Sequence, residues 1–149
     1  AAQIVPMAAR VGFEVVVTDD RPEFADPGRF PEAREVRHAA FDGLLEALPV
    51  DASSYLVIVT RGHVHDKTVL AQALRTPARY VGMIGSSRKI RIIQDRLLEE
   101  GFTQDQLDRV HAPIGLDIGA ETPEEIAVSI VAELILARAG GGKRKKRGG

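Results

Sequence analysis

The hydrophobic period of this chain alternates between two kinds of segment, and this alternation leaves few folds open. β-Branched, apolar runs occur at 13–18, 55–60 and 80–84, and segments with the helical spacing of apolar residues lie between and after them. The run at 13–18 is too apolar for a solvent-exposed face, as expected of a strand covered on both sides. Such strands joined by helices predict an α/β fold with a doubly wound, mostly parallel sheet.

Capping residues delimit the predicted helices. Asp66 is a suitable N-cap for the helix after the second run, and Gly101 ends the helix after the third. Thr122-Pro123-Glu124-Glu125 gives the strongest start signal, because it combines an N-cap, a first-turn proline and a capping-box glutamate. The other predicted elements are a helix over 4–11 ended by Gly12, an edge strand over 34–38, a helix over 41–48, a helical piece over 103–109 and a weak strand over 111–114.

Composition excludes several classes of protein. The 149 residues are 44% hydrophobic and 28% charged, which disfavours disordered, collagen-like and membrane-spanning chains. The chain has no cysteine, so a disulfide scaffold, thiol catalysis and cysteine-ligated metal are excluded within this stretch. No apolar run approaches the roughly 20 residues that span a bilayer. We therefore expect one domain over 1–139, without membrane contact and in the cytoplasm.

The net charge is unevenly distributed. It is −1 in total, and the run Lys143–Arg147 carries five positive charges, so the rest of the chain carries −6. A mildly acidic body does not suit the attraction that supplies most non-specific nucleic-acid affinity, and we expect no nucleic-acid partner. Residues 140–149 are predicted to form a basic, disordered tail.

The beginning of the chain lacks an expected strand. A helix leads straight into a buried parallel strand, which is the second half of a strand-helix-strand unit. In a doubly wound sheet the first strand is central, and without it backbone groups and apolar faces stay unpaired. We therefore expect residues before Ala1 in the natural protein to carry that strand and the turn after it.

Asp19-Asp20-Arg21 follows the first predicted strand, at the end where parallel α/β sheets bind their ligands. Nucleotide-binding folds place an acid there to bind a ribose hydroxyl. The same residues also suit a local role, in which an aspartate caps the backbone and Arg21 pairs with it. Both interpretations stay open on sequence alone.

Gly85-Ser86-Ser87-Arg88-Lys89 follows the third run and is the best anion site of the chain. Free N–H groups at a helix start and two basic residues suit a phosphate. The alternative is that a serine caps the helix while the basic residues face solvent. We expect replacement of Arg88 and Lys89 by alanine to weaken ligand binding and leave stability nearly unchanged.

Arg61-Gly62-His63-Val64-His65-Asp66 follows the second run, and alternate histidines can converge on a metal ion. The pattern resembles the His-x-His-x-Asp-His stretch of metallo-β-lactamase-like hydrolases, but Asp66 follows His65 directly. We expect no metal; a zinc or manganese hydrolase using His63 and His65 is an alternative.

The loop over 111–119 contains two glycines and a proline among apolar residues. It is expected to pack against a bound molecule or a neighbouring protomer, and the alternative is that it packs only against its own domain.

The sequence contains no nucleophile elbow, no Walker loop and no carboxylate pair with acid–base spacing. Composition and spacing alone thus support an α/β domain that binds a phosphorylated small molecule. Four segments in register, GFEVVVTDDRPEFA, TRGHVHDKTVL, YVGMIGSSRKI and PIGLDIGAETPEEIAVSIVAELI, resemble the C-terminal Rossmann domain of the xanthine dehydrogenase accessory factor family, XdhC/CoxI type. The domain over 1–139 is therefore expected to be Rossmann-like.

This resemblance implies a cofactor site, although the family's glycine-rich turn and its N-terminal domain with a cysteine motif are absent from this sequence. The positions that match the family's remaining loops, and that we expect to bind the cofactor, are Asp19, Asp20, Arg21, Arg61, Gly62, His63, Asp66, Gly85, Ser86, Arg88 and Lys89.

The resemblance also implies a function. It predicts a protein that binds molybdenum cofactor, as molybdopterin or its nucleotide form, protects it while a terminal sulfur is installed, and inserts it into a molybdenum hydroxylase apoenzyme such as xanthine dehydrogenase. A cysteine desulfurase is a further implied partner, and a homodimer is the commonest assembly. We favour a non-catalytic chaperone because no base and nucleophile are in mutual reach. The alternative is an NAD(P)- or FAD-dependent oxidoreductase.

Overall fold

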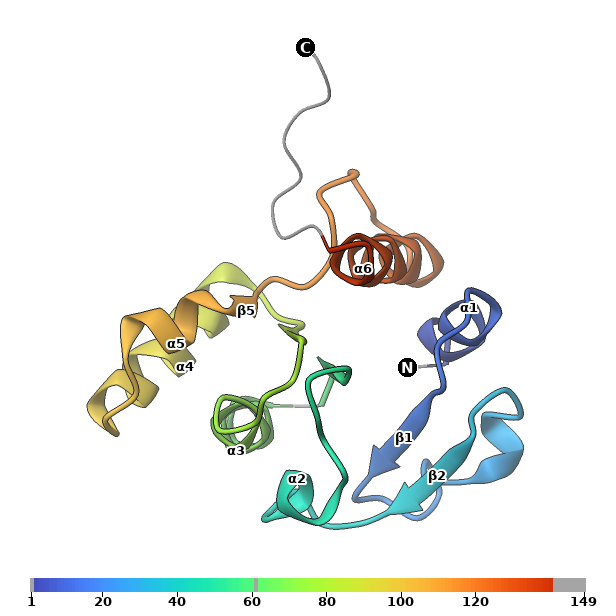
Figure 1. The fold of residues 1–149 in the computed structure, drawn as a ribbon, viewed down its shortest axis with the longest axis horizontal. Coiled ribbons are helices and arrows are strands. Elements are labelled where there is room, and N and C mark those ends of the chain that lie inside the picture. The colour runs from blue at the N-terminus through green and yellow to red at the C-terminus, as the bar shows by residue number, and fades with distance from the viewer. Residues whose placement is uncertain (1, 61, 141–149) are drawn as a thin grey trace.

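Figure 1 shows a computed structural model of the chain, which describes residues 2–60 and 62–140. The strands are β1 (Val16–Asp19), β2 (Glu35–His38), β3 (Tyr55–Ile58), β4 (Tyr80–Met83) and β5 (Val110–His111). The α-helices are α1 (Ile4–Arg10), α2 (Leu44–Ala47), α3 (His63–Ala73), α4 (Ser87–Glu99), α5 (Gln104–Asp108) and α6 (Pro123–Arg138), and a short 3-10 helix, η1, covers Pro27–Arg29. None of the described helices is long and apolar enough to cross a membrane.

All strand pairs are parallel, but they form two sheets. One sheet has the order β1-β2 and the other β3-β4-β5. The α/β class and its parallel pairing are thus confirmed. Within the described ranges, β1 pairs only with β2 and β3 only with β4, so no described strand joins the two sheets. A central strand supplied by residues before Ala1 stays a prediction.

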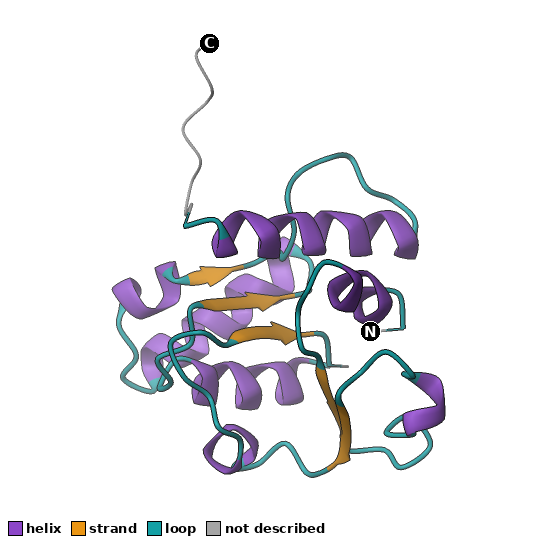
Figure 2. Cartoon of the chain, turned by 45° about the vertical axis from the view of Figure 1, so that its right-hand side comes forward, coloured by secondary structure: helices purple, strands orange, loops and turns teal. Residues whose placement is uncertain are grey.

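Alternate residues of β4 face two separate cores. Val81 and Met83 are almost completely buried in a core with α3 and α4, whereas Tyr80 packs with Ile130 and Leu134 of α6 on the other face. Figure 2 shows α6 and α3 on opposite sides of the three strands. This two-sided cover is why the strands are apolar on both faces.

Besides the start of α2, at Leu44 instead of 41, three boundaries differ notably from the sequence-based prediction. β1 begins at Val16 instead of 13, and Phe13 instead packs edge to face on Tyr55 with 5.1 Å between ring centroids. β5 covers only Val110–His111, although the Ile114 N–H still donates to the Met83 carbonyl at 3.0 Å. The third difference, at the start of α3, belongs to the functional site.

The predicted capping signals of α6 are confirmed. Thr122 and Glu125 form a reciprocal capping box, and Pro123 occupies the first turn. At the other end, the Arg79 guanidinium donates to the carbonyls of Ala137 and Arg138. Both ends of the helix therefore have partners for backbone groups that the helix itself leaves unpaired.

A buried carboxylate connects α6 to the sheet. The Tyr80 hydroxyl donates to Glu133 Oε1 at 2.5 Å, and the Gly115 N–H donates to the same oxygen at 3.2 Å. His111 stacks on the Tyr80 ring with 4.6 Å between centroids, and its Nδ1 lies 3.5 Å from Glu133 Oε1. Burial, followed by the bond to Glu133, raises the pKa of the Tyr80 phenol well above its usual range. Tyr80 is therefore a permanent donor to this carboxylate.

We predict that Tyr80→Phe lowers the free energy of unfolding by about 1–3 kcal/mol, because it leaves a buried carboxylate short of a donor. Tyr55→Phe is the matched control, since the described residues offer its hydroxyl no hydrogen bond, and it should change stability by less than about 0.5 kcal/mol. Urea unfolding measures both. Equal losses would contradict a stabilising role for the Tyr80 hydroxyl.

Candidate functional site

The turns that follow β1, β3 and β4 lie at the carboxyl ends of parallel strands. The Ile84 N–H donates to the Ile58 carbonyl at 3.0 Å, which joins the turns after β4 and β3. His65 Nε2 on α3 lies 4.0 Å from Asp20 Oδ2, so α3 also reaches the turn after β1. The structure thus brings together, at one edge, three of the segments that the sequence identified.

Asp66 and Lys89 form an ion pair at the centre of this edge. The Asp66 side chain is completely buried and that of Lys89 is only 17% exposed. The Thr60 hydroxyl donates to Asp66 Oδ1, whereas Oδ2 has no hydrogen bond within the described residues and faces the Lys89 ammonium. This single carboxylate therefore connects the turn after β3, the first turn of α3 and the first turn of α4.

The role of Asp66 corrects the sequence-based prediction. Helix α3 begins at His63, three residues before Asp66, and its N-cap is Gly62. Gly62 has a φ of +81°, a conformation that side-chain-bearing residues rarely adopt, so the helix can start at the next residue. Asp66 consequently lies in the first turn of the helix, where it points inward instead of capping the end.

Gly85 makes room for the lysine of this pair. A Cβ at Gly85 would lie 3.2 Å from Lys89 Cδ and 3.6 Å from Lys89 Cε. The stem of Lys89 therefore passes directly over the glycine on its way to Asp66. The glycine is needed here for packing as well as for a turn.

The start of α4 has the donors that an anion requires. Ser86 is its N-cap, since its hydroxyl accepts from the Lys89 N–H at 3.2 Å. The backbone N–H groups of Ser87 and Arg88 have no hydrogen-bond partner in the described part of the chain, and both residues are exposed. The serine cap of the alternative interpretation is thus present, and two N–H donors without a partner among the described residues lie beside it at the positive end of the helix dipole.

Asp19 and Arg21 form a local pair. The Arg21 guanidinium donates to both carboxylate oxygens of Asp19 at 2.9 Å, and the Arg21 N–H donates to Oδ1 at 3.0 Å. Arg21 also stacks on the Phe24 ring, 3.9 Å from its centroid. The side-chain hydrogen bond from Arg21 is the main cause that lowers the pKa of Asp19. Of the two aspartates, Asp20 is therefore the one available to a ligand.

The described neighbours of His65 are an aromatic ring and a carboxylate. His65 lies against the Phe41 ring, with 5.0 Å between centroids, and near Asp20. No group of three or more metal-ligating residues occurs among the described side chains. Arg61 and the side chain of His63 lie outside the described part of the structure.

The loop over 111–119 packs against its own domain. The Leu116 N–H donates to the Ser129 carbonyl at 3.1 Å, and a Cβ at Gly115 would collide with the Ser129 hydroxyl. These contacts support the structural interpretation of this loop.

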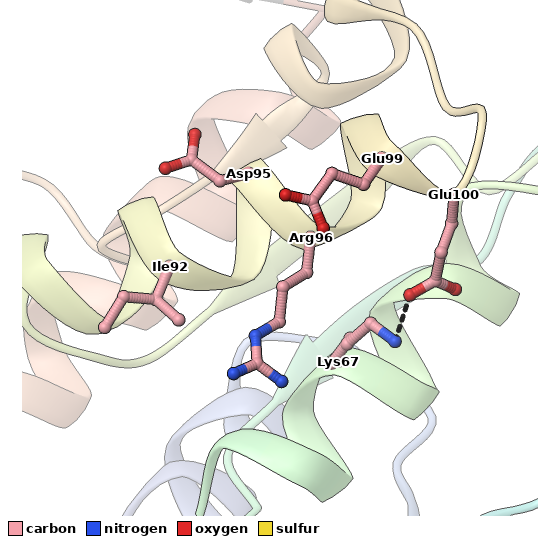
Figure 3. Close-up of a pocket in the computed structure, with 6 residues that line it drawn as sticks. All are labelled: Lys67, Ile92, Asp95, Arg96, Glu99 and Glu100. Atoms are coloured by element: carbon pink, nitrogen blue, oxygen red, sulfur yellow. Dashed lines mark ion pairs between the residues drawn. The ribbon is translucent and has the colours of Figure 1, made fainter.

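A surface hollow of about 490 Å³ lies between α3 and α4 (Figure 3). Charged side chains dominate its lining, and Lys67 pairs there with Glu100. None of the predicted site residues lines it. We therefore place the candidate site at the start of α4 and not in this hollow.

Sequence analysis missed the contribution of Thr60, because a threonine at the end of a strand has no distinctive signal. It also treated Lys89 as a surface residue. Lys89 instead pairs with a buried carboxylate, so its loss is now expected to lower stability.

Comparison with known proteins identifies the class. Residues 1–134 match the XdhC Rossmann domain, and the chain belongs to this family. It is 35% identical over 133 residues to the "Uncharacterized protein YqeB" of Escherichia coli K12, and 35% identical over 132 residues to a Bacillus subtilis 168 protein named as a probable xanthine dehydrogenase subunit. A crystal structure described as a xanthine dehydrogenase from Bacillus halodurans matches with a TM-score of 0.80 and 32% identity.

These relatives are much longer than this chain. The matches cover 89% of this chain but only 24% of the Escherichia coli protein and 38% of the Bacillus subtilis protein. The match to the Bacillus halodurans structure covers 99% of this chain and 41% of that one. The similarity thus establishes the family of this domain. It does not assign the activity of the longer proteins to this chain.

We predict that Lys89→Met lowers the free energy of unfolding by about 3 kcal/mol, because it leaves the buried Asp66 without a counter-charge. Lys67→Met is the matched control: its partner Glu100 is exposed, so the loss should be below about 1 kcal/mol. Chemical denaturation measures both. Similar small losses would show that the Asp66–Lys89 pair does not hold the turns together.

We predict a pH-dependent contribution from Asp19. Its pKa is lowered in the folded state, so its stabilisation is present above the unfolded pKa near 3.9 and disappears as the pH falls through the lower, folded value. The stability difference between the parent and Asp19→Asn should shrink on acidification below about pH 4. In a double-mutant cycle at neutral pH, Asp19→Asn and Arg21→Met should be non-additive. A pH-independent difference would contradict the pairing.

Proposed function

We propose that this domain binds the molybdenum cofactor by its phosphate at the start of α4 and serves the maturation of a xanthine dehydrogenase-type molybdenum hydroxylase. Membership of the XdhC family and the names of two relatives support this role. The observation that carries the proposal is the pair of free N–H groups at Ser87 and Arg88, at the carboxyl edge of a parallel sheet.

The charges of the site divide into two groups. Asp66 neutralises Lys89, and Asp19 neutralises Arg21. The exposed Arg88 side chain has no such ion pair within the described residues. We therefore assign the electrostatic attraction for a phosphate to Arg88 and the helix dipole, and we assign Lys89 to positioning of the turn. This division differs from the sequence-based expectation, in which both basic residues had the same role.

Two further predicted residues lie on segments that reach the same edge of the sheet. Gly62 starts α3 beside the Asp66–Lys89 pair, and Asp20 lies next to His65 of the same helix. In the nucleotide form of the cofactor, Asp20 would accept a hydrogen bond from the ribose hydroxyl. The proposed recipient is the hydroxylase apoenzyme, and a cysteine desulfurase would supply the terminal sulfur.

Delivery of the cofactor suits these residues better than turnover. Asp66 is enclosed, and its charge is already met by Lys89. General acid–base catalysis needs a group within hydrogen-bond reach of the substrate, and the charged atoms of this pair face each other instead. We therefore retain the chaperone role.

Ser87→Pro tests the anion site with little disturbance of the fold. Proline is favoured in the first helical position and lacks only the N–H. The preceding Ser86 has φ −69° and ψ 157°, which a following proline permits. We predict that Ser87→Pro and Arg88→Ala each weaken molybdopterin binding about tenfold or more, the loss of a charge-assisted hydrogen bond of ~1.5 kcal/mol. Anaerobic calorimetry measures this, because the chain has no tryptophan for fluorescence.

Arg91→Ala is the matched control, an exposed arginine one turn further along α4, and should leave the affinity unchanged. NAD, NADP and FAD are titrated in parallel. Tight dinucleotide binding without pterin binding would overturn the proposal in favour of an oxidoreductase. Equal pterin affinity of Ser87→Pro and the parent would place the phosphate elsewhere.

A further inference from the structure

Helix α6 buries the two polar side chains of its central part and exposes two large apolar ones. Its central part, 126–137, contains only two polar side chains, Ser129 and Glu133, and both face the interior with exposures of 4% and 8%. Val128 and Ile135 instead face outward with exposures of 48% and 38%. A surface helix ordinarily presents its polar face to water. Figure 2 shows α6 along the outside of the molecule, with the three-stranded sheet on its inner side.

Hydrogen bonds within the domain explain why the two polar side chains are buried. They do not explain why apolar residues, Val128 and Ile135, occupy exposed positions. Glu133 receives donors from Tyr80 and Gly115, and the Ser129 hydroxyl donates to the Ile126 carbonyl at 2.8 Å. The contacts of Glu133 with Tyr80 and Gly115 fix the rotation of α6 about its axis, whereas the Ser129 bond lies within the helix. The apolar side chains are consequently held at the surface, where exposed apolar area favours association.

The outer stripe of α6 is self-complementary. The half-buried Ala132 lies at its centre, with Val128 one turn before it and Leu136 one turn after it. In an antiparallel pair of α6 helices with a two-fold axis at Ala132, Val128 of each copy faces Leu136 of the other. The small central residue allows the helices to approach closely.

The ends of α6 carry opposite charges, which also favours an antiparallel pair. Glu121 and Glu124 are exposed at its start, whereas Arg79 and Arg138 are exposed at its end. An antiparallel pair places the acidic end of each copy beside the basic end of the other. The two helix dipoles are then also opposed in direction, which is the favourable arrangement.

We infer that the outer face of α6 is a dimer interface whose partner is a second copy of this chain, bound antiparallel about Ala132. The inference concerns a surface separate from the cofactor site and stands without the proposed function. One helix pair buries less area than the roughly 800 Å² per partner of a standard interface. The dimer is therefore concentration-dependent.

A cysteine at the two-fold axis tests the geometry. The chain has no cysteine of its own, so Ala132→Cys introduces a single thiol that lies within disulfide distance only if two copies meet there. Mild oxidation should convert Ala132→Cys to a covalent dimer. Leu98→Cys, at an exposed apolar position of α4 away from this face, is the matched control and should stay monomeric. Equal or slower cross-linking of Ala132→Cys would overturn the inference.

Sedimentation of the unmodified chain over a concentration series provides the second measurement. The parent should show a monomer–dimer equilibrium, Ile135→Glu should raise the dissociation constant at least tenfold, and Leu98→Glu should not change it. The two positions have nearly the same exposure, 38% and 39%, so the variants differ in location alone. A parent that is monomeric at every concentration would overturn the inference and indicate that another partner covers α6. Circular dichroism confirms that both variants fold.

Discussion

The buried ion pair between Asp66 and Lys89 is the interaction on which the carboxyl edge depends. A carboxylate without solvent exposure needs a counter-charge, and among the described residues the stem of Lys89, passing over Gly85, brings one to it. This requirement fixes the start of α4 relative to that of α3. The free N–H groups of Ser87 and Arg88 are therefore held in place by a pair of residues that need not touch the ligand themselves.

A second buried carboxylate has a comparable effect on the opposite face of the sheet. Glu133 accepts hydrogen bonds from Tyr80 and Gly115, and this sets the rotation of α6. The same rotation turns Val128 and Ile135 to the outside. Each of the two buried acids thus orients one surface of the domain, Asp66 the carboxyl edge of the sheet and Glu133 the apolar face of α6.

Strong local signals predicted their elements correctly. The apolar run at 55–60 contains β3, and Thr122 with Glu125 marks the start of α6, because burial on both faces and end capping depend on neighbouring residues alone. The start of α3 was predicted too late. Aspartate is a residue type that often caps helices, which is why Asp66 was predicted as the N-cap. Its side chain instead pairs with Lys89, which is far away in sequence and is brought near by β4 and the turn after it.

The sequence by itself determined the α/β class, the parallel strands, the family and the segments that reach the carboxyl edge, since these follow from hydrophobic period and short motifs. Only the tertiary structure decided which charges remain for a ligand. It paired Lys89 with Asp66 and Arg21 with Asp19, and left Arg88 at the start of α4. It also turned Glu133 inward and Val128 outward. Ion pairing and helix rotation depend on distances between segments remote in sequence, and no local pattern specifies those distances.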